Sequence, residues 1–363
     1  MDSRIREHAE VIVSHSTEIE RGDNVIVSGS PESEALLVAI AERCGEIGAT
    51  AITRMASYRA QRAYKRAIDP EDIEEDEMTR AQFEAADVLI LVRAPSNMTA
   101  QSDVPPEVNQ RKAQADKAVR EAYLDTQWVI TQYPTAAGAQ KAEMSTDAYE
   151  SFVWDAINRN WDAQRTHQQQ LADILDDGES VRIRAGERTD LTMSIAGNGA
   201  LNDHGEHNMP GGEVATVPVC DSVEGEVLFD LPVLVQGREL TDVWLRFEAG
   251  VVVEHAAEKN EEVLDSLLET DEGARRLGEL GIGMNRDIDQ FTYNMLFDEK
   301  MGDTIHLALG QALAECVGAE NAFNDSVVHT DMLVDMSEDA VLEIDGEVVQ
   351  RDGVFRWEDG FEG

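Results

Sequence analysis

Short apolar runs alternate with longer amphipathic stretches along the first half of the chain. The runs are predicted to be buried strands, and they cover Val25–Ser28, Ala51–Arg54, Asp87–Val92 and Gln127–Thr131. The stretches between them have the spacing of apolar residues that is typical of helices packed on one side. Alternation of apolar strands with such helices favours a mostly parallel sheet that is covered by helices.

Helix ends are marked by residues that favour them. Ser30-Pro31 is a typical helix start, and Gly48 is a typical stop. A further helix is predicted over Pro106–Tyr123. The longest helix is expected to begin after Ser145 and to continue towards Ile174.

Beyond this helix the pattern changes to short strands separated by Gly-rich turns. Strands are predicted at Val181–Arg184, Leu191–Ile195, Glu226–Leu228, Val233–Val235, Val243–Phe247, Val251–His255, Leu342–Ile344 and Glu347–Val349. Ala196–Gly212 is expected to be a loop, whereas Glu261–Leu268 and Glu272–Leu277 are expected to be helical. We therefore predict an α/β protein, with a helix-covered parallel-sheet domain over residues 1–170 and a mixed α+β domain over residues 171–363. The boundary is expected near residues 165–178.

The charge of the chain is far from that of an ordinary enzyme. Asp and Glu number 73 against 30 Lys and Arg, which gives a formal net charge of −43. The acids are dispersed over every segment, and dispersed excess acid is a feature of halophilic proteins. We interpret the charge as adaptation to high salt. Nucleic-acid binding is disfavoured, because the sequence offers no basic patch.

Cysteine usage and apolar runs indicate the compartment. Cys44, Cys220 and Cys316 are widely spaced and form no Cys-x-x-Cys motif, so we expect reduced thiols and neither a disulfide scaffold nor a thiolate zinc site. The first residues lack the apolar region of a signal peptide, and apolar runs such as Val88–Val92 are too short to span a membrane. We expect a cytoplasmic protein with no membrane partner.

Two histidines in apolar, strand-like segments are the first candidates for chemistry. His306 and His329 lie 23 residues apart, and Asp331 follows the second histidine by two positions. Side chains at i and i+2 of a strand point to the same face, so His329 and Asp331 can converge. Neutral imidazole and carboxylate are the usual ligands of a catalytic divalent metal. Glu213 and Glu279, both in Gly-punctuated segments, are candidate carboxylates for the same metal site.

Other interpretations of these residues stay open. Acids make up 73 of 363 residues, so a His-x-Asp pair is weak on its own, and a strand histidine is often a hydrogen-bonded core residue. His204 and His207 form an alternative metal pair, which we disfavour because a loop fixes no common face. The remaining histidines are expected at the surface; they are His8, His15, His167 and His255.

Four motifs together resemble those of the thermophilic metallo-aminopeptidase family, the aminopeptidase T and aminopeptidase S type. They are Asn208-Met-Pro-Gly-Gly-Glu213-Val214, Glu272-Gly-Ala-Arg-Arg-Leu-Gly-Glu279, Phe297-Asp-Glu-Lys300 with Thr304-Ile-His306-Leu-Ala-Leu-Gly310, and Val328-His329-Thr-Asp331-Met332. Their order and spacing agree with the family, and a weaker likeness extends over the first half. With its excess acid, the chain resembles a salt-adapted, haloarchaeal-like member.

The resemblance implies a fold, a reaction and a set of ligands. It implies a C-terminal catalytic domain, a homodimer, and removal of N-terminal residues from peptides through a hydroxide activated by two divalent ions. Zinc is expected, with cobalt or manganese as alternatives. The implied ligands are Glu213, Glu279, His306, His329 and Asp331. Glu279 or Glu299 is the candidate proton shuttle, but for Glu299 beside Lys300 we expect a solvated turn.

One position departs from the family pattern. The family has an active-site tyrosine seven residues after the first histidine, where this chain has Leu313, which cannot stabilise an oxyanion. Tyr293 is a candidate substitute. Two alternatives therefore stay open: a catalytically impaired metal-binding homologue, and an iron-dependent dihydroxypyridine ring-cleaving dioxygenase on the same fold.

Overall fold

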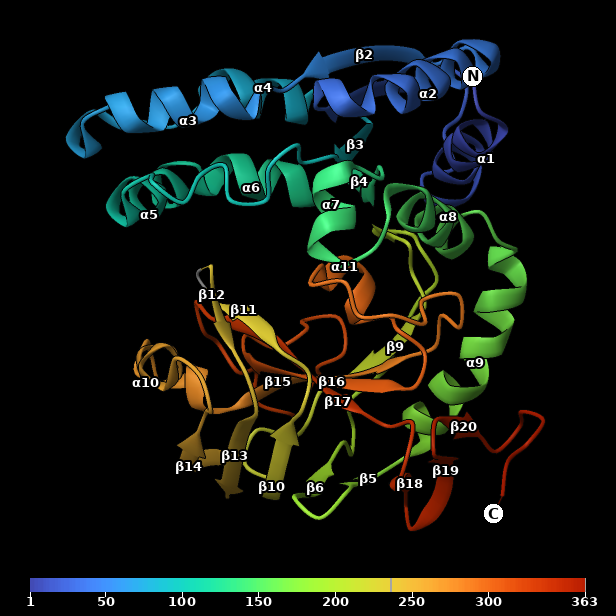
Figure 1. Cartoon of the computed structure of the whole chain (residues 1–363), viewed down its shortest axis with the longest axis vertical. Coiled ribbons are helices and arrows are strands. Elements are labelled where there is room, and N and C mark those ends of the chain that lie inside the picture. Colours follow the sequence, from blue (N-terminus) through green and yellow to red (C-terminus); the bar gives the residue numbers. More distant parts are fainter. Residues whose placement is uncertain (236, 363) are drawn as a thin grey trace. The chain divides into compact units, whose positions relative to one another are not determined.

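The computed structural model describes residues 1–235 and 237–362, and these divide into two compact units (Figure 1). The first unit comprises Met1–Arg159 and Gly205–Gly211, and the second comprises Asn160–His204 and the described residues from Gly212 onward. Within the described residues, no helix is both long and apolar enough to cross a membrane.

A five-stranded sheet forms the centre of the first unit, with strand order β2-β1-β3-β4-β8. Every pairing in it is parallel, as the sequence predicts. Its strands are β1 (Asn24–Gly29), β2 (Thr50–Met55), β3 (Val88–Arg93), β4 (Gln127–Gln132) and β8 (Asn208–Met209). All four predicted strands of this half are confirmed. Two strands lie inside the expected loop Ala196–Gly212, β8 here and β7 (Ala200–Asp203) in the second unit, so that prediction was wrong at both places.

The helices of the first unit are mostly short. They are α1 (Ser3–Val11), α2 (Glu34–Ile47), α3 (Tyr58–Ala67), α4 (Glu77–Glu84), α5 (Pro106–Ala115), α6 (Lys117–Leu124), α7 (Ala136–Lys141) and α8 (Thr146–Ile157), with a π turn at Ile12–Ser16 and 3-10 turns at Pro31–Ser33 and Pro70–Asp72. Gly48 ends α2 in the left-handed conformation with φ +91°, as expected of a helix stop.

Two predicted helices are each divided in the structure. The Pro106–Tyr123 helix breaks at Asp116 into α5 and α6. The helix predicted from Ser145 towards Ile174 ends at Ile157, and α9 (Trp161–Asp177) then begins in the second unit. Asn160 caps α9 by accepting a hydrogen bond from the backbone N–H of Ala163, so a new helix start interrupts the apolar periodicity.

His8 is fully buried, which corrects its expected surface position. Its Nε2 atom lies 2.7 Å from Oγ1 of Thr131 on β4, and its ring meets Trp154 edge-on at 5.3 Å. Burial lowers the pKa of His8 to about 3, because the protein interior disfavours the charged imidazolium. His8 is therefore a neutral core residue of the first unit.

The second unit is built from antiparallel sheets. An eight-stranded sheet has the order β14-β13-β10-β6-β5-β18-β19-β20, a five-stranded sheet has the order β17-β16-β15-β9-β7, and β11 and β12 form a ribbon. The strands are β5 (Ser180–Ala185), β6 (Thr189–Ser194), β7 (Ala200–Asp203), β9 (Glu213–Thr216), β10 (Glu224–Phe229), β11 (Val233–Val235), β12 (Arg238–Leu240), β13 (Val243–Glu248), β14 (Val251–Ala256), β15 (Leu277–Gly283), β16 (Thr304–Gly310), β17 (His329–Asp335), β18 (Ala340–Ile344), β19 (Glu347–Arg351) and β20 (Val354–Phe355).

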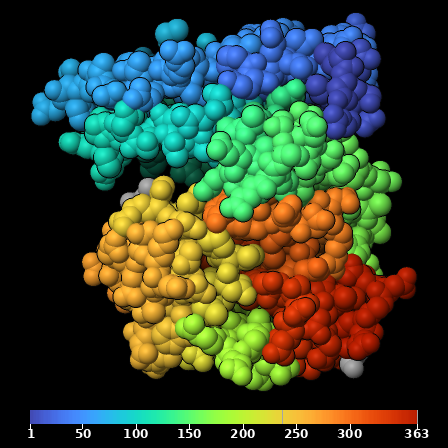
Figure 2. All heavy atoms as spheres, viewed as in Figure 1, coloured from blue at the N-terminus to red at the C-terminus, as the bar shows by residue number. Residues whose placement is uncertain are grey.

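Distant parts of the sequence lie side by side in this unit. β18, drawn in red, pairs with β5, drawn in green, and the spheres of Figure 2 show the two colours in contact. Apolar side chains of both larger sheets share one core with α9 and with α10 (Glu261–Leu268). A parallel-sheet unit and a mixed α+β unit together confirm the predicted α/β class.

The helix predicted over Glu272–Leu277 is wrong. A 3-10 turn at Gly273–Arg275 leads directly into β15, whose seven residues are all buried. The glycines of β15 allow the neighbouring backbone to approach closely: a Cβ on Gly278 would lie 2.3 Å from the carbonyl oxygens of Gly310 and Gln311.

Candidate metal centre

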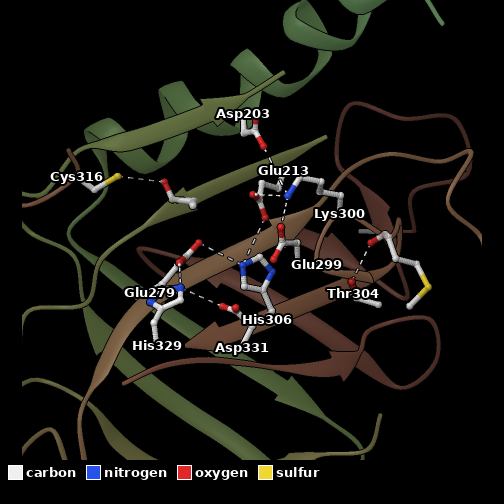
Figure 3. A network of polar contacts seen from close by, with 12 residues as sticks. Asp203, Glu213, Glu279, Glu299, Lys300, Thr304, His306, Cys316, His329 and Asp331 are labelled. Atoms are coloured by element: carbon white, nitrogen blue, oxygen red, sulfur yellow. Dashed lines mark hydrogen bonds and ion pairs between the residues drawn. The ribbon is translucent and has the colours of Figure 1, made fainter. Parts of the chain in front are cut away.

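Four adjacent strands of the five-stranded sheet carry the five residues implied as ligands. Glu213 begins β9, Glu279 lies in β15, His306 in β16, and His329 and Asp331 in β17. Because the strand order is β17-β16-β15-β9, residues far apart in the sequence become neighbours. Figure 3 shows their side chains converging from these strands on one region.

Glu279 lies between the two histidines. Its Oε1 atom is 3.3 Å from Nε2 of His306, and its Oε2 atom is 3.4 Å from Nε2 of His329. The two carboxylate oxygens therefore face two different imidazoles. This is the arrangement that a carboxylate bridging two ions would need.

Two further carboxylates complete the cluster. Oε2 of Glu213 lies 3.5 Å from Nε2 of His306, and Oδ1 of Asp331 lies 3.5 Å from Nε2 of His329. The ligand atoms form two groups, in each of which all atoms lie within 4.8 Å of one another: Glu213 with Glu279 and His306, and Glu279 with His329 and Asp331. Imidazole and carboxylate suit a divalent ion of the zinc, cobalt or manganese type.

The hydrogen bonds of the cluster fit this chemistry. Nδ1 of His329 donates to the carbonyl of Gln311 at 3.0 Å, which leaves Nε2 as the free ligand nitrogen. Oε2 of Glu213 is buried with no hydrogen-bond partner in the described part of the chain. A buried carboxylate oxygen that makes no hydrogen bond, and has only the His306 imidazole before it at 3.5 Å, is costly unless a closer cation occupies that space.

Gly281 makes room for His306. The two residues are partners on β15 and β16, and a Cβ on Gly281 would lie 2.0 Å from Cε1 of the imidazole. The ring can lie across β15 only because this position has no side chain. The sequence thus positions one ligand through a glycine on the neighbouring strand.

Burial and crowding shift the pKa values in the cluster. Burial raises the pKa of Glu213 to about 8, and burial together with Glu279 raises that of Asp331 to about 6. Burial opposes a charge on the two histidines, but the carboxylates around them, Glu279 foremost, raise the pKa of His306 to about 10 and that of His329 to about 9. The cluster therefore strongly favours positive charge at its centre.

Lys300 and Glu299 belong to the same network, and the solvated turn expected for them is wrong. Lys300 is completely buried, and the side chain of Glu299 is 16% exposed. They follow α11 (Met295–Asp298), and the Lys300 ammonium forms an ion pair with Glu299. The sequence held one signal for this: Lys300 is among only six lysines, and it lies between apolar Phe297 and Met301.

Other residues considered from the sequence lie in different surroundings. Leu313 packs against an apolar cluster of Val217, Ala312 and Cys316. The hydroxyl of Tyr293 donates to Oε1 of Glu239 at 3.3 Å. His207 stacks on Trp128 in the first unit at 4.5 Å between ring centroids, whereas His204 belongs to the second unit.

A pocket of about 530 Å³ opens beside His329 and Asp331. Its lining is otherwise uncharged, although 28% of the chain is charged, and it consists of Val233, Leu234, Val235, Leu267, Thr270, Met295, Val327, Val328 and Thr330. Leu234 and Val327 are exposed at 40% and 87%. A volume of this size accommodates a small ligand group.

Known proteins resemble the chain over nearly all of its length. The sequence pattern of the thermophilic metalloprotease (M29) family matches residues 1–355. Aminopeptidase T of Thermus aquaticus is 29% identical over 389 aligned positions, and the alignment covers 93% of each chain. Aminopeptidase 2 of Geobacillus stearothermophilus is 29% identical over 401 aligned positions, and the alignment covers 97% of this chain and 95% of that relative.

Solved structures share the fold. Wild-type AmpT from Thermus thermophilus has a TM-score of 0.85 at 24% identity, over 98% of this chain and 99% of that one. A 2,5-dihydroxypyridine dioxygenase from Pseudomonas putida KT2440 has a TM-score of 0.59 at 14% identity, over 98% and 97%. The first confirms the α/β class, and at these identities both likenesses concern the fold alone. The family match over residues 1–355 decides the class of enzyme: the chain belongs to the thermophilic metalloprotease (M29) family and is a metal-dependent peptide-bond hydrolase.

Proposed function

We propose that this enzyme is an aminopeptidase that removes N-terminal residues from peptides, with two divalent ions in its centre. Glu213, Glu279 and His306 would hold one ion, and Glu279, His329 and Asp331 would hold the other. The observation that carries this proposal is the position of Glu279, which turns one oxygen to each histidine. The aminopeptidase relatives support the substrate class.

Zinc is the expected metal, with cobalt or manganese as alternatives, since the donors are imidazole and carboxylate. Ions bound in pairs polarise a carbonyl oxygen and lower the pKa of water, which is the chemistry that peptide hydrolysis needs. The protein contributes a cluster that is buried at Glu213, Glu279 and His306 and exposed at His329, and the ligand atoms of each group lie within 4.8 Å of one another.

Glu299 is the better candidate for the proton shuttle. Both oxygens of Glu279 face imidazoles, so this carboxylate is fully engaged as a ligand. Glu299 turns Oε1 to the Lys300 ammonium, and Figure 3 shows its carboxylate between Lys300 and His306. A partly exposed carboxylate beside the reacting region can take a proton from water and pass it to the leaving amine.

Selection of N-terminal residues would follow from the bound ions. Five carboxylates surround the centre, those of Asp203, Glu213, Glu279, Glu299 and Asp331. Lys300 forms ion pairs with Asp203, Glu213 and Glu299. Two bound divalent ions would offset these carboxylates, and one ion would hold the free α-amine of a peptide, which would restrict cleavage to the N-terminal residue. The apolar pocket beside His329 is where the side chain of the N-terminal residue would lie.

The excess acid is proposed to be a salt adaptation, and the enzyme is proposed to act as a cytoplasmic homodimer. A charge of −43 repels itself, and salt reduces this repulsion as the Debye length falls to about 3 Å at 1 M. The three cysteines are free thiols, which suits a reducing compartment. Sedimentation in molar salt tests the dimer.

The decisive experiment measures metal content and hydrolysis on one sample purified in molar salt. We expect about two zinc- or cobalt-type ions per chain and release of the chromophore from an aminoacyl p-nitroanilide. An N-acetylated substrate is the control and should not be cleaved. Iron without hydrolysis would indicate the oxygenase alternative. Bound zinc without turnover would indicate an impaired homologue and would point to Leu313.

A further inference from the structure

Lys300 is a fully buried lysine in the network of Figure 3, and carboxylates surround its ammonium. Its ammonium lies 3.1 Å from Oε1 of Glu213 and 3.7 Å from Oδ2 of Asp203, and it forms a third, close ion pair with Oε1 of Glu299. The ammonium donates hydrogen bonds to Glu213 and Glu299, whereas its contact with Asp203 is an ion pair beyond hydrogen-bond distance. A lysine with no exposure is retained only where such partners compensate its lost hydration.

The contact with Glu213 assigns separate tasks to the two oxygens of that carboxylate. Oε1 accepts from Lys300, whereas Oε2 faces Nε2 of His306 at 3.5 Å. The ammonium thus fixes the rotation of the Glu213 carboxylate and aims its second oxygen at the centre. Partners of this kind orient metal ligands, and their loss typically weakens metal affinity by about 10- to 100-fold.

The contacts of Lys300 are confined to one side of the cluster. Within the described residues, its three ion-pair partners lie on β9, on β7 and in the turn after α11, and neither His329 nor Asp331 of β17 is among them. Asp203 and Glu213 are themselves partners on neighbouring strands. Lys300 therefore acts on the Glu213 group and not on the group of His329 and Asp331.

We propose that Lys300 is a positioning residue for one of the two ion sites: it holds Glu213 and Glu299 towards the centre, so that its loss weakens the Glu213 site and spares the Asp331 site. This inference rests on the proposed two-ion centre. It assigns Lys300 no contact with substrate. It also makes the two sites unequal, since one depends on a buried ammonium and the other does not.

Lys300→Met tests the proposal, because methionine keeps the length of the side chain and removes the charge. Cobalt titration of the metal-free protein in molar salt, followed by the visible absorption of the bound ion, reports each site without any need for activity. We expect the unchanged protein to bind two ions. In Lys300→Met, the affinity of the Glu213 site should be 10- to 100-fold lower, and the affinity of the Asp331 site should not change. Glu213→Gln should give the same pattern.

Asp298→Asn is the matched control. Asp298 is a buried carboxyl group two residues away, but its Oδ1 atom accepts from the backbone N–H and the hydroxyl of Thr292 and belongs to neither ion group. This variant should bind both ions as the unchanged protein does. Equal affinities in Lys300→Met and the unchanged protein would overturn the inference, and so would equal weakening of both sites.

Lys300→Arg covers the case in which the methionine variant does not fold. Arginine keeps the charge, but its longer, planar head cannot place its donors where the ammonium stands. We expect the metal affinity of the Glu213 site alone to fall. Unchanged affinity at both sites would contradict the proposal. Failure of the underlying function looks different, since the unchanged protein would then bind fewer than two ions or cleave no aminoacyl substrate.

Discussion

The imidazole of His306 lies across Gly281 on the neighbouring strand, at a distance that leaves no room for a Cβ atom. Gly281→Ala should therefore push the ring away from Glu213 and Glu279. We expect metal affinity to fall by tenfold or more, which is about what loss of one orienting contact costs. Isothermal titration with zinc measures it. Gly45→Ala is the control: nothing lies within 4 Å of its Cβ position in α2, so metal binding should not change there.

Asp331→Asn should remove a ligand and leave the shape of the side chain. Because the amide carries no charge, we expect metal uptake and hydrolysis both to fall by more than the roughly 100-fold seen when only a supporting contact is lost. His306→Ala should behave alike. Asp335→Asn, an exposed change on the same strand, serves as control. Full metal content in Asp331→Asn would refute its role as a ligand.

Glu299→Gln separates the proton shuttle from the ligands. The variant should retain both ions, since Glu299 belongs to neither ligand group, and should lower kcat by about 10²- to 10⁴-fold. Glu279→Gln should instead lose metal. Steady-state kinetics and metal analysis on the same preparations distinguish the two. A Glu299→Gln enzyme with normal kcat would exclude the shuttle role.

Leu234→Lys probes the apolar pocket. Leu234 is 40% exposed at its lining, so a charge there should not unfold the protein. It should raise KM for a leucyl substrate roughly tenfold, because a buried apolar side chain contributes about 1.5 kcal/mol or more, while kcat changes little. Val253→Lys, 42% exposed on β14 and absent from the pocket, should leave both constants unchanged. Equal KM values in the two variants would place the substrate side chain elsewhere.

His8 should make the first unit sensitive to acid. Its pKa is about 3 in the folded chain against 6.5 for the free side chain, so between these pH values the unfolded chain binds a proton that the folded chain does not. Stability should therefore fall as the pH drops below 6.5, by up to about 1.4 kcal/mol per pH unit. His8→Gln should flatten this dependence in urea unfolding curves recorded in molar salt. An unchanged slope would mean that another group causes it.

The sequence allowed some of these features to be predicted for clear physical reasons. Parallel β1 to β4 follow from apolar runs, and the pairing of His329 with Asp331 on one face follows from the two-residue period of a strand. The adjacency of Glu213 and Glu279 does not follow, because it depends on the order of strands in a sheet. Local patterns cannot show that order.

Burial of polar and charged side chains is the other feature that local patterns miss. Lys300 is buried because Asp203 and Glu213 approach it from β7 and β9, almost a hundred positions earlier in the chain. His8 is buried because Thr131 offers it a partner on β4. In both cases the polar partner comes from a strand that is distant in the sequence. The residues adjacent in the sequence therefore cannot show that the side chain has a buried partner.

Because the candidate ligands come from four separate strands, metal binding is coupled to the folding of the second unit. No two of β9, β15, β16 and β17 are joined by a short hairpin loop, so the ligand set exists only once the sheet of the second unit has assembled. Ions that bind this set stabilise the folded form by mass action, by about 2.7 kcal/mol when present at 100 times Kd. Metal bound at the centre would thus stabilise the folded sheet as well as take part in the reaction. A chelator should lower the melting temperature of the second unit and leave that of the first in place.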